Sequence, residues 1–283
     1  MPAPSQPAPG AKTEGTPAEG AARKRTRTLA VCAAPVVALL AVAALVPLPF
    51  VIAQPGSTTA NVLGEHKDKP VITITGAATR RTSGQLRMTT IEATGPDARV
   101  GLGDVVDSWF RTDRAVMPRD SVYPAGQSDE EIERHNSAEM KKSQDSAAQA
   151  ALRYLHRSPK DVKVELSLAD VGGPSAGLLF TLGVIDKLDG DGRGGDLTGG
   201  RSIAGTGTIE PDGTVGPVGG VSLKTRAARR DGATVFLVPK EECSDARAEL
   251  PAGLRLIPVT DLKDAVSSLK ALAAGQRVPA CPA

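Results

Sequence analysis

The chain has 283 residues, enough for one large domain or two small ones. Its formal net charge of +2 is too small to indicate a nucleic-acid partner, and aromatic residues make up only 2% of it, so its core must be built from aliphatic side chains. Three cysteines are too few for a small disulfide-stapled fold, and three histidines add no zinc pattern. We expect neither a metal nor a cofactor.

The N-terminal part divides into a polar tail and an apolar run. Residues 1–28 begin with Pro, Ala, Gly, Ser and Thr, which bury too little surface to order, and predict a disordered basic tail. Residues 29–53 are almost uncharged and long enough to span a bilayer, so they predict one transmembrane helix; a cleaved signal peptide is the alternative. The basic cluster Arg23–Arg27 would stay cytoplasmic, which places everything after Gln54 outside the cytoplasm.

The next segment predicts few regular elements. Residues 54–83 mix Pro, Gly, Thr and charged residues and indicate a juxtamembrane linker, with an edge strand at 71–74. A strand is expected at 86–91 and a short helix at 105–110, in which Trp109 is interpreted as a packing residue. The polar residues 118–136 predict an exposed loop.

The remaining segments show clear periodicity. Apolar residues repeat at helical spacing over 137–155, and alternation over 162–168 predicts a half-buried strand. Further along we expect a strand over 203–209, a turn at 210–213, a helix that Lys224 opens, strands at 234–238 and 254–259, and a last helix capped by Thr260 or Asp261. Residues 186–200 faintly resemble a calcium loop, but they read more simply as a solvated turn.

Ser175 lies in the run Gly173-Pro174-Ser175-Ala176-Gly177, directly after an expected strand. Proline suits the first turn of a helix, so Ser175 is expected at a helix N-terminus, where backbone N–H groups favour negative charge. The run also fits the nucleophile elbow of α/β-hydrolases, but these enzymes need a histidine after the serine. All three histidines precede it; a triad using His156 stays formally possible, and an ordinary turn serine is the simplest alternative.

A lysine could activate Ser175 if its amine were neutral. The reference pKa of lysine is about 10.4, so burial would have to lower it by several units. Lys224 follows the glycine-rich turn 216–220 and lies among apolar residues at the start of an expected helix, whose positive end disfavours a second positive charge. A lone lysine is more often a surface residue, so Lys224 becomes a candidate base only in combination with Ser175.

Several motifs recur at the spacing of one protease family. They are Thr206-Gly207-Thr208-Ile209, Gly213-Thr214-Val215, Gly216-Pro217-Val218-Gly219-Gly220, Ala227-Ala228 and Val238-Pro239, together with Lys224 and the run around Ser175. Residues 84–273 thereby resemble the proteolytic domain of the Lon family, and in particular the membrane-anchored, Lon-like proteases of bacteria. The resemblance implies an α+β fold with a proteolytic domain over 84–275 and a C-terminal tail over 276–283.

The resemblance also implies roles for individual residues. Ser175 would be the nucleophile and Lys224 its general base, and Thr206 would help to hold the lysine amine. The backbone around Gly173, Pro174 and Ala176 would hold the oxyanion. The implied function is a serine endopeptidase with a Ser-Lys dyad; the alternative is a non-catalytic membrane-anchored module that kept the fold and lost turnover.

Two differences from the family shape the expected substrates. The PDZ domain usual in the anchored branch has no room here, since only residues 156–161 separate the helix from the following strand. No Gly-Lys dipeptide occurs, so there is no P-loop and no ATP-driven unfolding. We therefore expect extended or unfolded protein segments as substrates, and a homo-oligomer is compatible with the pattern. Cys243 and Cys281, if both are extracytoplasmic, are candidates for a disulfide.

Overall fold

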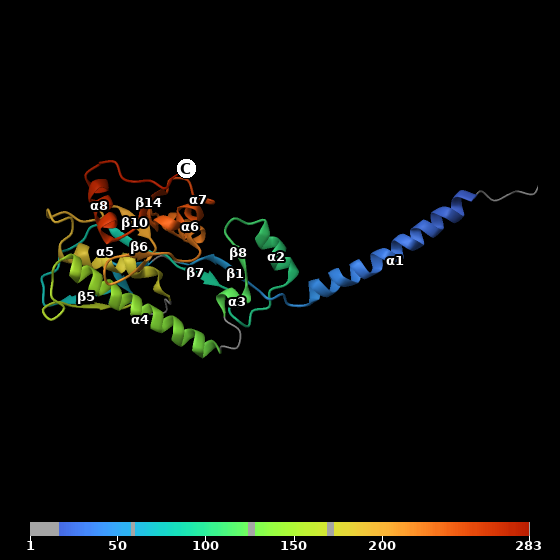
Figure 1. Ribbon diagram of the computed structural model, residues 1–283, viewed down its shortest axis with the longest axis horizontal. Helices are drawn as coiled ribbons and strands as arrows, with labels where there is room; N and C mark the ends of the chain where they lie inside the picture. Colours follow the sequence, from blue (N-terminus) through green and yellow to red (C-terminus); the bar gives the residue numbers. More distant parts are fainter. Residues whose placement is uncertain (1–16, 58–59, 124–127, 169–172, 283) are drawn as a thin grey trace, which may run out of the picture. The chain divides into compact units, whose positions relative to one another are not determined.

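The computed structural model describes residues 17–57, 60–123, 128–168 and 173–282. The chain divides into two compact units, one made of residues 1–48 with 101–103 and the other of residues 49–100 with 104–283 (Figure 1). The second unit contains every residue expected to carry chemistry.

The first unit contains one long helix, α1 (Pro17–Leu45). Residues 17–28 are therefore helical, although a disordered tail was predicted there; residues 1–16 of that tail lie outside the described residues. The predicted transmembrane helix over 29–53 is wrong at its C-terminal end, because Phe50–Ala53 belong to strand β1 (Phe50–Pro55). Pro47 and Pro49, which lack the N–H that a helix needs, lie between the two elements. Across the described ranges, no helix has both the length and the apolar character needed to cross a membrane.

A five-stranded sheet forms the centre of the second unit, in the order β14-β13-β10-β6-β2. Four of its strands run parallel, and β2 pairs with β6 in the antiparallel direction. The bounds of the strands are Ala60–Asn61 (β2), Gln85–Met88 (β6), Ser202–Gly205 (β10), Val235–Pro239 (β13) and Arg255–Val259 (β14). The parallel order brings the carboxyl ends of β6, β10 and β13 to one edge of the sheet.

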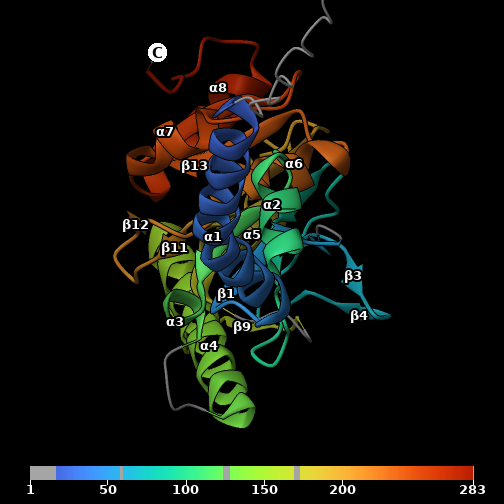
Figure 2. The same cartoon turned by 90° about the vertical axis from the view of Figure 1, so that its right-hand side faces the viewer.

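Helices cover both faces of this sheet. Val235 and Leu237 of β13 enter the larger apolar cluster, which also contains buried residues of α4, α5 and α8, whereas Phe236 and Val238 enter a smaller cluster with α6 and α7. This alternation is the period of two expected for a strand buried on both faces. Figures 1 and 2 show α4 and α7 on opposite sides of the strands. The helices are α4 (Asp129–Tyr154), α5 (Gly177–Leu188), α6 (Val221–Arg230), α7 (Cys243–Arg247) and α8 (Leu262–Ala273).

Smaller elements complete the second unit. β1 pairs with two strands in a three-stranded antiparallel sheet, and three two-stranded pairs lie outside it. The elements are β7 (Ile91–Ala93) and β8 (Ala115–Pro118) beside β1, the pairs β3 (Glu65–His66) with β4 (Lys69–Pro70), β5 (Ile72–Thr75) with β9 (Lys163–Leu166) and β11 (Thr208–Ile209) with β12 (Val215–Gly216), and the short helices α2 (Leu102–Trp109) and α3 (Arg119–Val122).

Three further predictions differ from the structure. The long helix α4 begins at Asp129 rather than at residue 137, because Ser128 and Glu131 form a capping box that the polar composition of residues 118–136 obscured. The strand expected over 203–209 is two strands, since the chain leaves the central sheet after Gly205 and enters the hairpin β11–β12 at Thr208. The expected packing role of Trp109 is wrong: its side chain is 78% exposed.

Candidate active site

Three threonines and a glutamate mark the edge where the parallel strands end. Thr89 and Thr90 follow β6, Thr206 follows β10, and Glu242 follows β13 by way of a 3₁₀ turn. The Thr89 hydroxyl, which is buried, donates a hydrogen bond to the Gly205 carbonyl over 3.2 Å and so ties the ends of two neighbouring strands together. In open sheets of this kind, the crevice beyond the carboxyl ends is the usual place for a site.

Ser175 lies in the middle of a 3₁₀ turn, Pro174–Ala176, that leads into α5. Gly173 enters the turn with φ = 93°, a conformation that glycine adopts without steric cost. The turn is fixed from α4, because the Ser143 hydroxyl donates to the Pro174 carbonyl over 3.0 Å. The Gly173 N–H donates to Asn136 O at 3.4 Å, and Pro174 carries no N–H, so these two residues shape the turn without offering a free donor.

Lys224 lies on the first turn of α6 and is only 3% exposed. Helix α6 begins at Val221, three residues before the expected start, after Gly220 with φ = 67°. The Val221 N–H donates to an Asp245 carboxylate oxygen at 3.0 Å, so a side chain of α7 satisfies the helix N-terminus. The lysine therefore stands on a helix whose first turn is anchored from the neighbouring element.

Thr206 connects the lysine to the serine turn. The Lys224 amine donates to the Thr206 hydroxyl oxygen at 3.2 Å, and that hydroxyl donates to the Ser175 carbonyl at 3.3 Å. The Gly207 N–H reinforces the same contact with a 3.0 Å bond to the Ser175 carbonyl. Among the described residues, no hydrogen bond joins the Ser175 hydroxyl itself to Lys224. The two side chains nevertheless line one cavity of about 260 Å³.

Burial lowers the pKa of the Lys224 amine from its ordinary 10.5 to about 8. The negative charges of Glu242 and Asp245 act in the opposite direction and keep the pKa from falling further. An amine with a pKa about one unit above neutral is deprotonated in roughly a tenth of the molecules at pH 7, which suffices for a general base.

The cavity around the two side chains is lined mainly by apolar groups. Ile91, Pro174, Pro217 and Val218 form its walls, with Thr90, Thr208 and Gly219 completing the lining. Few of these groups could pair with a charged group, so the space suits small or apolar groups better than charged ones.

Glu242 and Asp245 lie near Lys224, although the sequence did not indicate them as site residues. Glu242 Oε1 accepts the Val218 N–H at 2.9 Å, while its Oε2 is buried without a partner among the described residues. Burial raises the pKa of the Glu242 carboxyl, although its bond from Val218 and the charge of Lys224 oppose this. The available signal was their position directly after β13, since the end of a parallel strand adjacent to β10 must lie near Thr206.

A disulfide joins Cys243 to Cys281, with their Cα atoms 5.4 Å apart. Cys243 lies between Glu242 and Asp245, so the bridge ties the C-terminal residues to the element that holds both carboxylates. Cys32 of α1 is a free, exposed cysteine.

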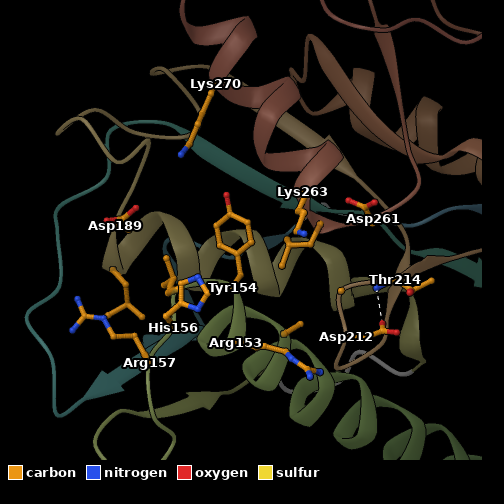
Figure 3. Close-up of a pocket in the computed structure, with 15 residues that line it drawn as sticks. Arg153, Tyr154, His156, Arg157, Asp189, Asp212, Thr214, Asp261, Lys263 and Lys270 are labelled. Carbon is orange, nitrogen blue, oxygen red and sulfur yellow. Dashed lines mark hydrogen bonds between the residues drawn. The ribbon is translucent and has the colours of Figure 1, made fainter.

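A second, larger cavity lies away from Ser175 and Lys224. It measures about 880 Å³ and is bordered by the end of α4, the end of α5, the tip of the β11–β12 hairpin and the start of α8 (Figure 3). His156, raised above as a member of a histidine-first triad, lines this cavity and not the one that contains Ser175. The geometry therefore gives no support to a serine-histidine pair.

Comparison with known proteins agrees with the position of this site. Residues 139–271 match the model of the Lon protease (S16) C-terminal proteolytic domain, a range that includes Ser175, Thr206 and Lys224. The chain is 38% identical over 95 residues to a Lon protease of Chloroflexus aggregans and 35% identical over 96 residues to one of Azospirillum brasilense; each match covers 32% of this chain. It is 27% identical over 124 residues, 42% of the chain, to Lon protease 2 of Bacillus subtilis.

These relatives are much longer than the region they share with this chain. The matches span 11% of the first two relatives and 21% of the third. The similarity thus concerns the proteolytic part of those proteins alone. Together with the mixed α/β architecture, it indicates a fold like that of the Lon proteolytic domain.

Proposed function

We propose that the protein is an ATP-independent serine endopeptidase in which Ser175 is the nucleophile and Lys224 the general base. The observation that carries the proposal is the placement of both side chains in one cavity, with the lysine buried and hydrogen-bonded through Thr206 to the serine turn. A buried lysine without a carboxylate partner at hydrogen-bond distance is costly, and such groups are found where a shifted pKa serves chemistry.

The reaction follows from these positions. The neutral Lys224 amine takes the proton of the Ser175 hydroxyl as its oxygen attacks the peptide carbonyl, and the resulting ammonium then protonates the leaving amine. Water hydrolyses the acyl-enzyme in a second cycle of the same proton transfer. The backbone N–H groups of Ser175 and Ala176 would stabilise the oxyanion, since those at the start of α5 donate to Pro174 O and Gly207 O. One such donor typically contributes about 2.7–4 kcal/mol.

Thr206 keeps the lysine in place during this cycle. Its hydroxyl oxygen accepts from the amine in the structure, and the acceptor remains available whether the amine is charged or neutral. The bond lets the buried ammonium that follows proton transfer keep one satisfied N–H, which lowers the cost of forming it inside the protein.

The proposed substrates are extended or unfolded protein segments. The cavity at Ser175 is small, about 260 Å³, so it suits a single strand of polypeptide better than a folded surface. The absence of a P-loop motif from the printed sequence supports cleavage without ATP.

The proposed location is outside the cytoplasm. The Cys243–Cys281 disulfide supports it, because such bonds persist in oxidising compartments and are rare in the cytosol. Counting free thiols with and without reductant tests this part of the proposal: two additional thiols should appear after reduction, and equal counts would contradict it.

The dyad is tested with a serine-directed fluorophosphonate probe on the full chain. Wild-type protein should be labelled at Ser175, and labelling should be lost in Ser175→Ala and in Lys224→Ala. Ser267→Ala and Lys160→Ala, which change exposed residues away from the cavity, are the matched controls and should label normally. Undiminished labelling in Lys224→Ala, with an unchanged thermal melting temperature, would reject the dyad. No labelling of the wild type would favour the non-catalytic module instead.

A further inference from the structure

The large cavity is rich in cationic side chains that lack ion-pair partners. Arg153, Arg157, Lys263 and Lys270 all line it, and none of them forms a salt bridge with another described residue. Elsewhere in the same unit, Arg80, Arg114 and Arg226 do pair with carboxylates. Three carboxylates also line the cavity, so its formal net charge is +1 (four cations minus three carboxylates), and the charge of Arg153 acts on the Asp212 carboxyl.

The acidic residues of the cavity are largely committed to the backbone. Asp212 accepts the Thr214 N–H at 2.9 Å, which closes the hairpin turn, and this bond lowers the pKa of the Asp212 carboxyl. Asp261 accepts the Asp264 N–H at 2.9 Å as the N-cap of α8. Asp189, at the end of α5, is the third carboxylate in the lining. Two of the three acids thus have structural roles that explain their presence without pairing to the cations.

A neutral donor lies among the cations. The Tyr154 side chain is half-buried, and burial raises the pKa of its hydroxyl, so the group stays protonated at neutral pH. In Figure 3 the Lys270 amine and the Tyr154 hydroxyl point into the same space, with Lys263 on the opposite side of the tyrosine ring. Two ammonium groups and a phenol donor around one space are suited to carboxylate oxygens.

The hairpin β11–β12 links this cavity to the proposed catalytic one. Thr208 at the base of the hairpin lines the cavity of Ser175, whereas Asp212, Gly213 and Thr214 at its tip line the cationic cavity. Gly213 lies five positions after Thr208, which is at most about 17 Å of extended chain at about 3.3 Å per residue. A substrate held at Ser175 could therefore reach the tip of the hairpin with about five further residues.

We propose that the cationic cavity is an exosite that binds an acidic segment of the polypeptide substrate, about five or more residues from the bond that Ser175 cleaves. The proposal rests on the proposed peptidase function for its role, but the binding itself does not require catalysis. The exosite increases the occupancy of the catalytic cavity by holding the substrate at a second point, which lowers KM and leaves kcat unchanged.

Binding is measured first, with the full-length Ser175→Ala variant. A fluorescein-labelled peptide carrying four alternating Asp and Glu residues should bind, and its Lys and Arg counterpart should not. Lys263→Ala/Lys270→Ala should weaken the acidic peptide about fivefold to tenfold, while the matched double variant Lys142→Ala/Lys163→Ala, on exposed residues elsewhere, should not. Equal weakening in both doubles would overturn the exosite, as would binding of inorganic tripolyphosphate without binding of the peptide.

Cleavage then tests the spacing. A neutral peptide that the wild-type chain cleaves is extended, at either end, by the same acidic segment through a Gly-Ser spacer of six or nine residues. The six- and nine-residue spacers both exceed the length of the hairpin and should lower KM at least about threefold at one end. The gain should vanish in Lys263→Ala/Lys270→Ala with kcat intact. If the acidic segment leaves KM unchanged, the exosite proposal is wrong and the peptidase proposal is unaffected. If the wild-type chain cleaves no peptide at all, the peptidase proposal is wrong instead.

Discussion

The two cavities at the ends of the β11–β12 hairpin use lysine in opposite ways. At the base, one lysine is 3% exposed, and burial lowers the pKa of its amine to about 8. At the tip, Lys263 is exposed and Lys270 half-buried, and both line a much larger cavity. The same kind of side chain is thus buried with a lowered pKa in one cavity and accessible to solvent in the other.

This contrast separates binding from chemistry. A charge in contact with water is screened by salt and contributes modestly to any one contact, whereas a buried amine interacts strongly with each neighbouring group. Changes at the base of the hairpin should therefore act on turnover by orders of magnitude, and changes at the tip should act on KM by small factors.

The largest difference is expected when a lysine of each cavity is replaced by methionine. Lys224→Met should reduce kcat by at least about 10³-fold, because it removes the general base while keeping the apolar stem. Lys263→Met, the matched change at the tip, should alter kcat less than twofold on a neutral peptide. Initial rates of peptide cleavage, with circular dichroism to verify the fold, give the comparison. Similar losses in the two variants would show that the cavities do not differ in role.

The next effect concerns the support of the buried amine. Thr206→Val keeps the shape but removes the hydroxyl that accepts from Lys224, and a hydrogen bond to a charged group contributes about 1.5–3 kcal/mol. We expect kcat to fall about 10- to 100-fold, and Thr206→Ser to restore most of it. A valine variant with wild-type kcat would mean that the amine needs no partner at this position.

A smaller effect is expected on the pH profile. The activity should rise with pH as the Lys224 amine, with its pKa of about 8, loses its proton. Glu242 raises that pKa through its negative charge, so Glu242→Gln should move the midpoint of kcat/KM to lower pH. Glutamine can still accept the Val218 N–H, which keeps the loop in place. Glu241→Gln, on an exposed neighbour, is the control, and an upward shift in Glu242→Gln would contradict the assigned charge effect.

The smallest effect is expected from salt. At 0.5 M NaCl the advantage of an acidic extension should shrink to less than about twofold, because the cations at the tip are solvated. Cleavage of the neutral peptide should change little, since the amine at the base is buried. A neutral peptide that is equally sensitive to salt would remove the distinction between the two cavities.

Much of this arrangement follows from sequence pattern. The alternation before Ser175, the glycine-rich turns and the helical repeats predicted most elements, since these patterns are local. The capping box at Ser128 was overlooked within a polar stretch, and the break of the strand at Thr206 depends on where the chain leaves the sheet. Trp109 shows a further limit, because an aromatic residue in a short amphipathic helix gives no sign of which face meets solvent.

The sequence predicted the residues of the candidate site that belong to motifs. It did not predict those that only the strand order brings to the site. Ser175, Thr206 and Lys224 come from spaced motifs, whereas Glu242 and Asp245 acquire meaning only once β13 is known to pair with β10. The cationic cavity lies further out of reach, because its side chains come from α4, the hairpin tip and α8, which no sequence period connects.

The disulfide between Cys243 and Cys281 makes the restraint of this part of the chain depend on the redox environment. It closes a loop of 38 positions, which in the chain-entropy description contributes about 4 kcal/mol, comparable to a large part of a domain's whole stability. Asp245 accepts the first N–H of the helix that carries Lys224, and Glu242 accepts the Val218 N–H just before that helix, so both carboxylates share in this restraint. A chain in which both cysteines are reduced lacks this restraint, and oxidation to the disulfide supplies it.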